Sequence, residues 1–159
     1  MEWNRGEAMT GTYAAAVQRI LIGRVMATSG AVVAVVGTFL PWLRSGARRR
    51  SSYEIFSLVD RLGFSESSLV GWGVRLWPIV PLLVAGATTL QWFPRKWVSG
   101  IVTTVAVVYA GGVSAAVETA PSSSLVAIEY GALVTLAGAL GLAAGALVTL
   151  RAHPLSNRQ

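Results

Sequence analysis

Uncharged apolar residues run along this chain in four blocks, separated by shorter polar or charged segments. The clearest block is Tyr130–Leu150, twenty-one residues without a charge between Glu129 and Arg151. At about 1.5 Å per residue, a helix of this length spans roughly 31 Å, which matches the hydrocarbon core of a bilayer. The pattern therefore predicts a membrane-spanning helix.

The first block carries a single charge, Arg24, close enough to the helix end for its side chain to reach the headgroups. A cleaved signal peptide is the alternative here, but the uncharged stretch 25–43 is longer than a usual signal-peptide core, and no A-x-A site follows. We therefore expect an uncleaved helix. The four predicted spans lie at about 20–43, 77–93, 98–117 and 130–150.

The segment 44–76 is the longest polar part of the chain. It opens with a basic, turn-rich piece, 44–50, after which Ser51 and Glu54 fit a capping box at a helix start. Apolar residues then recur at three-residue spacing along one face: Tyr53, Phe56 and Val59. We predict a short amphipathic helix that lies flat on the membrane, over the ends of the bundle or against a partner.

The predicted fold is an all-α membrane protein, a four-transmembrane-helix bundle whose long first extramembrane loop carries this short helix. One membrane domain, 20–150, is flanked by an N-terminal lead-in, 1–19, and a C-terminal tail, 151–159. Small residues let neighbouring helices approach closely, and two of the glycines form a G-x-x-x-G step. The candidate helix-packing glycines are Gly111, Gly138, Gly141 and Gly145.

Composition agrees with a membrane protein. Of the 159 residues, 53% are hydrophobic and 13% charged, with a mean hydropathy of +0.58, whereas soluble domains carry about 25% charged residues. A net charge of +6 does not indicate nucleic acid here, because the basic residues stand beside apolar runs, where they set topology and meet anionic headgroups. The expected partners are membrane lipids and other membrane subunits or a second copy.

Four spans place both termini on one side of the membrane. Counting basic residues hardly selects that side, since seven lie with the termini and six lie opposite. The short turn with Arg95 and Lys96 and the charges that flank the first and last spans favour cytoplasmic termini. The cluster Arg48, Arg49 and Arg50 argues for the opposite orientation.

Catalytic chemistry has little support in the sequence. The chain has no cysteine and no H-E-x-x-H, G-x-S-x-G or P-loop motif, and its single histidine, His153, lies in the tail. We expect no enzyme activity, no metal and no cofactor. Six tryptophans suggest a binding pocket, but five of them lie near predicted span ends, where an aromatic belt explains them.

Two groups of charges remain as candidate sites. Arg75, Glu118 and Glu129 fall at one membrane edge, where a glutamate could handle protons or simply cap a helix or pair with Arg75. The cluster Arg48, Arg49 and Arg50 could contact a partner or anionic lipid, or could be a solvated turn. The candidate partner or lipid contacts are this cluster together with Tyr53, Phe56 and Val59.

The segments PWLRSG at 41–46, RSSYEIF at 50–56 and LG at 62–63 resemble small four-helix membrane proteins of unassigned function from high-GC Gram-positive (actinobacterial) bacteria. The alanine, valine and arginine bias, with one lysine, is similar to such proteomes. This resemblance implies a bacterial membrane protein and brings no activity. The layout also resembles that of claudins, but the paired cysteines and the Gly-Leu-Trp signature of that family are missing.

Two functions are compatible with these features. An accessory or assembly subunit of a respiratory or cell-envelope complex in the inner membrane is favoured by the small-residue helix faces and the amphipathic loop helix. A small transporter or proton-linked carrier is the alternative, although the spans offer mainly hydroxyls, with Gln91 as their only amide.

Overall fold

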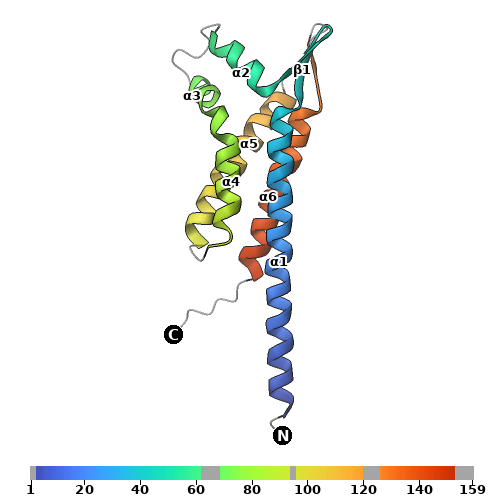
Figure 1. The fold of residues 1–159 in the computed structure, drawn as a ribbon, viewed down its shortest axis with the longest axis vertical. Coiled ribbons are helices and arrows are strands. Elements are labelled where there is room, and N and C mark those ends of the chain that lie inside the picture. The colour runs from blue at the N-terminus through green and yellow to red at the C-terminus, as the bar shows by residue number, and fades with distance from the viewer. Residues whose placement is uncertain (1–2, 62–68, 94–95, 120–125, 153–159) are drawn as a thin grey trace.

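The computed structural model describes residues 3–61, 69–93, 96–119 and 126–152. Helices dominate these residues, and the longer ones run side by side as a bundle (Figure 1). The bundle consists of α1 (Trp3–Phe39), α4 (Val80–Leu90), α5 (Lys96–Glu118) and α6 (Gly131–Ala152). A small sheet and short helices cover one end.

Within the described parts of the chain, three helices are long and apolar enough to cross a membrane: Ala14–Phe39, Val98–Glu118 and Gly131–Ala152. These spans agree with three of the four predicted ones. The second predicted span, 77–93, is a shorter apolar helix, Trp77–Leu90. It consists of η1 (Trp77–Ile79), a single 3₁₀ turn, followed by α4, and a proline stands in the first turn of each, where no helical N–H partner is lost.

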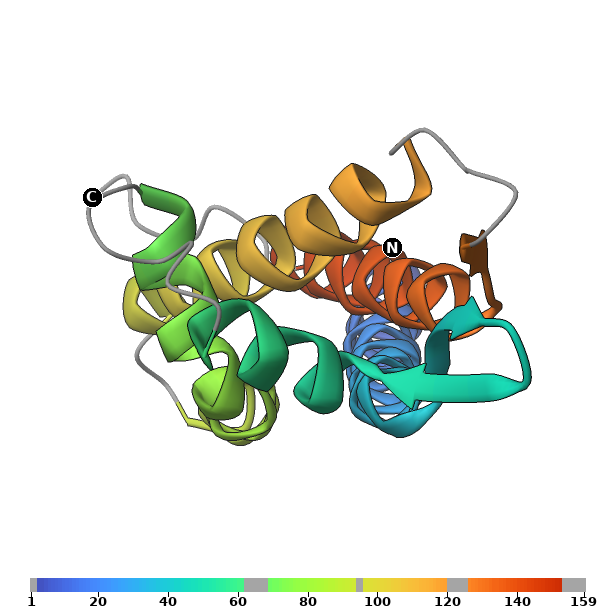
Figure 2. The same ribbon diagram turned by 90° about the horizontal axis from the view of Figure 1, so that it is seen from above.

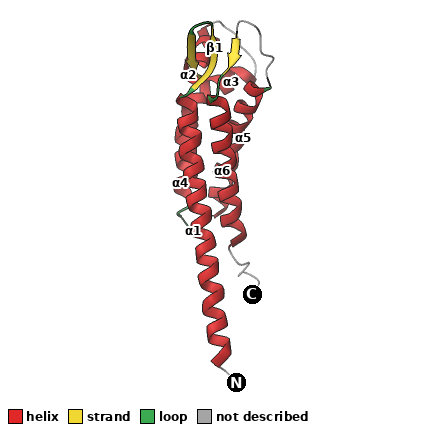
Figure 3. Ribbon diagram, turned by 90° about the vertical axis from the view of Figure 1, so that its right-hand side faces the viewer, coloured by secondary structure: helices red, strands yellow, loops and turns green. Residues whose placement is uncertain are grey.

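The first helix differs from its prediction at both ends. It begins at Trp3, so the expected lead-in is helical, and it ends at Phe39 rather than at Leu43. With 37 residues it has a length of roughly 55 Å and extends well beyond the end of α6 (Figures 1 and 3). Residues 41–43, which were predicted to end this helix, instead belong to a strand that starts at Pro41.

An all-α fold was therefore the wrong expectation for the polar end. The basic piece at 44–50 forms a hairpin of β1 (Pro41–Ser45) and β2 (Arg48–Ser51), turning at Gly46 with a positive φ of 61°. A third strand, β3 (Val126–Ile128), pairs antiparallel with the free edge of β1, giving the order β2-β1-β3. Figure 2 shows the hairpin above α1.

The predicted amphipathic helix is present as α2 (Ser52–Arg61), followed by α3 (Leu69–Leu76). The capping box is confirmed in part, because the Glu54 carboxylate accepts a hydrogen bond from the backbone N–H of Ser51 at 3.0 Å. α2 runs from the hairpin toward the start of α4 across the end of the bundle (Figure 2).

α1 and α6 form the most extensive helix contact, and they run antiparallel (Figure 3). A Cβ added to Gly138 would lie 2.2 Å from the backbone nitrogen of Ala34, and one added to Gly30 would lie 2.3 Å from that of Leu142. Backbones this close leave no room for any side chain. The glycines of this contact recur every seven residues: Gly23, Gly30 and Gly37 on α1, and Gly138 and Gly145 on α6. Gly131, seven residues before Gly138, lies equally close to residues 40–42, which follow α1.

Two other predicted packing glycines have more room. A Cβ at Gly141 would meet the Cα of Gly30 at 3.2 Å, a tight contact but not an overlap. A Cβ at Gly111 of α5 would lie 3.6 Å from the Cβ of Ala139, an ordinary contact. The close face of α6 therefore follows the seven-residue spacing rather than the G-x-x-x-G step.

Candidate functional site

The predicted docking face of α2 packs on its own chain. The ring of Phe56 lies 4.9 Å from that of Trp77 and 6.3 Å from that of Trp42, and Tyr53 lies 5.1 Å from Phe39. These contacts agree with the alternative in which the helix lies over the end of the bundle, whereas contact of the half-buried Tyr53 and Phe56 with a partner or lipid stays a prediction. Val59 belongs to α2, and its side chain falls outside the described residues.

Trp42 and Trp77 are fully buried, which corrects the prediction that an aromatic belt accounts for both. Trp42 Nε1 donates to the carbonyl of Gly37 at 2.9 Å, and Trp77 Nε1 donates to Ser52 Oγ at 2.9 Å. Ser52 Oγ in turn donates to the carbonyl of Thr38 at 2.6 Å. Each indole N–H is therefore satisfied, as buried tryptophans require. Trp72 and Trp92 remain exposed, as a belt residue would be.

These contacts join several elements in one aromatic cap, which we define as Trp42, Phe56, Trp77 and Tyr109. The ring of Trp77 lies 5.2 Å from Trp42 and 5.9 Å from Tyr109 of α5, whose hydroxyl donates to the carbonyl of Gly73. The cap is a structural joint that connects α2 and α5 with β1, which follows α1, and with η1, which precedes α4.

The three predicted membrane-edge charges lie near this end but do not pair with one another. Arg75 Nε lies 3.5 Å from Asp60 Oδ1, and Glu129 Oε1 lies 3.8 Å from Arg49 Nε. Pairing of Arg75 with either glutamate was therefore a wrong expectation. Glu118 has a buried Oε1 without a hydrogen-bond partner among the described residues.

The basic cluster occupies β2 and is largely solvated. Arg48 and Arg49 are exposed and Arg50 is half-buried. The Arg49–Glu129 pair connects β2 to the segment between β3 and α6. The structure shows the cluster as a solvated hairpin strand with one ion pair. Contact of the cluster with a partner or with lipid stays a prediction.

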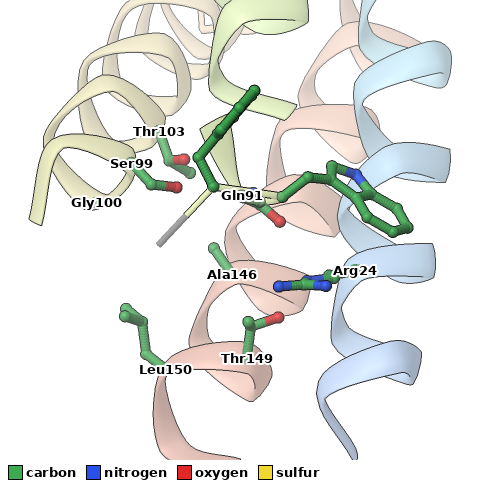
Figure 4. Close-up of a pocket in the computed structure, with 10 residues that line it drawn as sticks. Arg24, Gln91, Ser99, Gly100, Thr103, Ala146, Thr149 and Leu150 are labelled. Atoms are coloured by element: carbon green, nitrogen blue, oxygen red, sulfur yellow. The ribbon is translucent and has the colours of Figure 1, made fainter. Parts of the chain in front are cut away.

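A cavity of about 310 Å³ lies at the opposite end of the bundle, beside the connection between α4 and α5. Figure 4 shows the Arg24 guanidinium reaching from α1 toward Thr149 of α6, with Ser99 and Thr103 of α5 on the far side. Gln91, which follows α4, completes the polar lining. Three helices and the segment that follows α4 thus contribute to one polar space.

Several polar atoms of this cavity are buried and lack partners within the part of the chain that the structure describes. They are Arg24 Nε, both side-chain polar atoms of Gln91, and Thr103 Oγ1. The Trp92 ring covers the guanidinium, with its centroid 5.0 Å from Arg24 Cζ, a cation–π distance. A buried polar group without a partner costs free energy, so such a cluster is unusual unless something fills it.

No candidate site residue from the sequence lies in this cavity. The sequence did single out Arg24 as the only charge inside the first span, and Gln91 as the only amide of the spans. What it could not show is that they meet, because 66 residues separate them and only the packing of α4 against α1 brings them together.

Metal chemistry finds no support among the described residues, where no three histidine, aspartate or glutamate side chains cluster. His153 lies outside the described residues. Comparisons with protein-family models, curated proteins and solved structures give no match. The structure therefore supports a small multi-pass membrane protein with a buried aromatic cap at one end and an unsatisfied polar cavity at the other.

Proposed function

We propose that this chain is a non-enzymatic accessory or assembly subunit of a larger membrane complex. The supporting observation is an apolar groove of about 360 Å³ between α1 and α4 on the side of the bundle. Val32 and Val36 of α1 are exposed along it, and Ala85 and Thr88 of α4 form the opposite wall. An apolar groove with small and β-branched walls on the side of a membrane bundle offers a surface on which a neighbouring helix can pack.

The groove chemistry favours an apolar helix over a polar substrate. Three threonines line it, and each donates its hydroxyl to a carbonyl one turn earlier in its own helix: Thr28 to Arg24, Thr88 to Val84 and Thr89 to Ala85, at 2.9, 2.8 and 2.9 Å. Membrane helices associate through small and β-branched surfaces of this kind. We infer that the partner is a transmembrane helix of another subunit.

The proposal includes four membrane crossings. Because β3 pairs with β1, the ends of α1 and α5 and the start of α6 lie at the same end of the bundle. α5 therefore starts at the other end, and the chain must cross back between β2 and α5. The apolar helix Trp77–Leu90 is the segment available for this crossing.

We further propose that both termini face the cytoplasm, in the inner membrane of a bacterium as the sequence resemblance implies. Single cysteines at Ser45, exposed on β1, and at Ser156, in the tail, report this in a chain without native cysteine. A membrane-impermeant thiol reagent is expected to label Ser45→Cys in intact cells and to leave Ser156→Cys unlabelled. The reverse result would invert the orientation.

A bulky residue in the groove tests the subunit proposal. Ala85→Trp fills the groove, whereas Ala137→Trp adds the same side chain at an exposed position of α6 outside the groove lining. In mild detergent extracts we expect wild type and Ala137→Trp to migrate in one high-mass complex and Ala85→Trp to migrate as the free chain. Identical migration of all three would remove the groove as a subunit contact.

A small carrier is the second candidate, and the polar cavity beside Arg24 and Gln91 is the observation that favours it. A carrier needs a polar path that opens to each side in turn. Uptake measured in vesicles that contain only this chain separates the two functions, because an accessory subunit is expected to move no solute alone.

A further inference from the structure

We propose that the polar cavity at the Arg24 end of the bundle binds the phosphate group of an anionic membrane lipid. The site, named here the Arg24 cavity, consists of Arg24, Gln91, Ser99 and Thr103, with Thr149 at its edge. This proposal does not depend on the subunit function, since the cavity and the α1/α4 groove share no lining residue.

The donors in the cavity call for an anion. The guanidinium of Arg24 can only donate hydrogen bonds. Among the described residues its buried Nε has no hydrogen-bond partner, and neither ion pair described above involves Arg24. Thr103 is only 5% exposed, yet its Oγ1 has no partner there. The amide of Gln91 adds two more donors. Phosphate oxygens accept several such bonds at once, and arginine matches their geometry.

The described lining of the cavity carries one positive charge and no acid. All of its described lining residues other than Arg24 are uncharged, and in the sequence Arg95 and Lys96 follow shortly after Gln91. An unpaired arginine at membrane depth is costly and is normally retained for a partner. The electrostatic balance of this end therefore favours a negatively charged ligand.

The rim of the cavity points to a lipid as the carrier of the phosphate. Trp92, Phe93 and Leu150 line the cavity and are exposed by 56, 59 and 49%, so apolar surface surrounds its polar interior. A volume of about 310 Å³ is at the low end of ligand pockets, which run from about 300 to 1,000 Å³. It can hold a headgroup but not acyl chains, which would lie on the rim.

The short α4 explains why a headgroup reaches this depth. The apolar helix Trp77–Leu90 spans about 21 Å, less than the hydrocarbon core of about 30 Å. A short span draws the headgroup region inward at its end. That end is Gln91, directly at the cavity.

Lipid titration followed by native mass spectrometry tests the proposal on the purified full chain. The probes are phosphatidylglycerol, diacylglycerol with the same acyl chains, and inorganic phosphate. We expect saturable binding of phosphatidylglycerol, and at least about tenfold weaker binding after Arg24→Gln, as the loss of a charge-assisted hydrogen bond implies. Arg19→Gln is the matched control, because it removes the same charge from an exposed position of the same helix.

A second variant and a second readout keep the test independent of folding. Thr103→Val keeps the side-chain shape and removes one donor, so we expect it to weaken binding severalfold. Phosphatidylglycerol should also raise the thermal unfolding midpoint of wild type and of Arg19→Gln, but not that of Arg24→Gln.

Three results would overturn the proposal. Equal binding of diacylglycerol would show that only acyl chains are recognised. Equal phosphatidylglycerol binding by wild type, Arg24→Gln and Thr103→Val would show that the cavity is not the site. Competition by inorganic phosphate at concentrations similar to those of the lipid would reassign the cavity to a free phosphate.

Discussion

The α1–α6 pair and the α4–α5 pair use small and polar residues in opposite ways. Between α1 and α6, glycines bring two backbones into contact and every buried threonine is satisfied, as when Thr135 and Thr149 donate to the carbonyls of Gly131 and Gly145 at 3.0 and 2.9 Å. Beside α4 and α5, Thr103 and Gln91 keep unpartnered polar atoms around a cavity. The contact between α1 and α6 is closed, whereas the cavity that Arg24 of α1 shares with α5 leaves polar atoms available for interactions.

This difference indicates where the two pairs derive their stability. Contact between glycine faces depends on van der Waals packing that any side chain would destroy. The α4–α5 pair instead is attached through the aromatic cap at one end, where Trp77 contacts Trp42 and Tyr109. We therefore expect substitutions at the glycine face to disrupt the whole fold, and substitutions at the cap to release mainly one half.

The strongest test of the comparison is Gly138→Leu against Gly112→Leu. The added side chain would overlap the backbone of Ala34 at the first position, whereas a Cβ at Gly112 meets nothing within 4 Å. We expect Gly138→Leu to destabilise the fold by at least about 4 kcal/mol and Gly112→Leu to change it little, measured by unfolding in a denaturing detergent. Gly141→Ala should fall between them. Equal stability of both leucine variants would place the close helix contact elsewhere.

A charge in the aromatic cap tests the joint between the two pairs. Phe56→Asp would place a carboxylate beside Trp42 and Trp77, at a cost of roughly 3 kcal/mol. Leu58→Asp adds the same charge at an exposed position of α2 and should cost much less. Amide exchange should speed up in α2 and α4 of Phe56→Asp while α6 stays protected. Faster exchange throughout would mean that the two pairs unfold together.

The smallest expected effect belongs to the ion pair between Arg49 and Glu129. The Arg49 side chain is 58% exposed and the N–O distance is 3.8 Å, so solvent screens the attraction. A double-mutant cycle with Arg49→Gln and Glu129→Gln should give a coupling of less than about 1 kcal/mol. A larger coupling would show that surface charge helps to hold the hairpin on α6.

Local patterns in the sequence predicted the features that depend on neighbouring residues. Uncharged runs gave three spans, including Gly131–Ala152 to within two residues at either end, because burial in lipid requires continuous apolar length. The Ser51 and Glu54 spacing gave the start of α2, because a capping box is a contact within one turn.

Features that depend on contacts between distant residues could not be predicted from the sequence. The piece 44–50 is basic rather than alternating, and it becomes part of a sheet because β1 gains partners on both edges, one of them from 126–128. Trp42 and Trp77 lie near span ends, as belt residues do, and only the position of Ser52 and Phe56 buries them. The Arg24 cavity likewise exists only once α1, α5, α6 and the segment after α4 are assembled.

The pairing of Leu43 with Ile128 also sets an order of events during synthesis. The ribosome releases β1 before α4 and α5, so the edge of β1 that pairs with β3 stays unpaired until β3 has been synthesised. Loop closure over such a separation is slow and comes late in folding. The hairpin is positively charged at this stage, since β1 contains Arg44 and β2 contains Arg48, Arg49 and Arg50. Charged edge strands resist pairing with other chains. The arginines at this end can therefore act as a safeguard against aggregation during membrane insertion, before the sheet is complete.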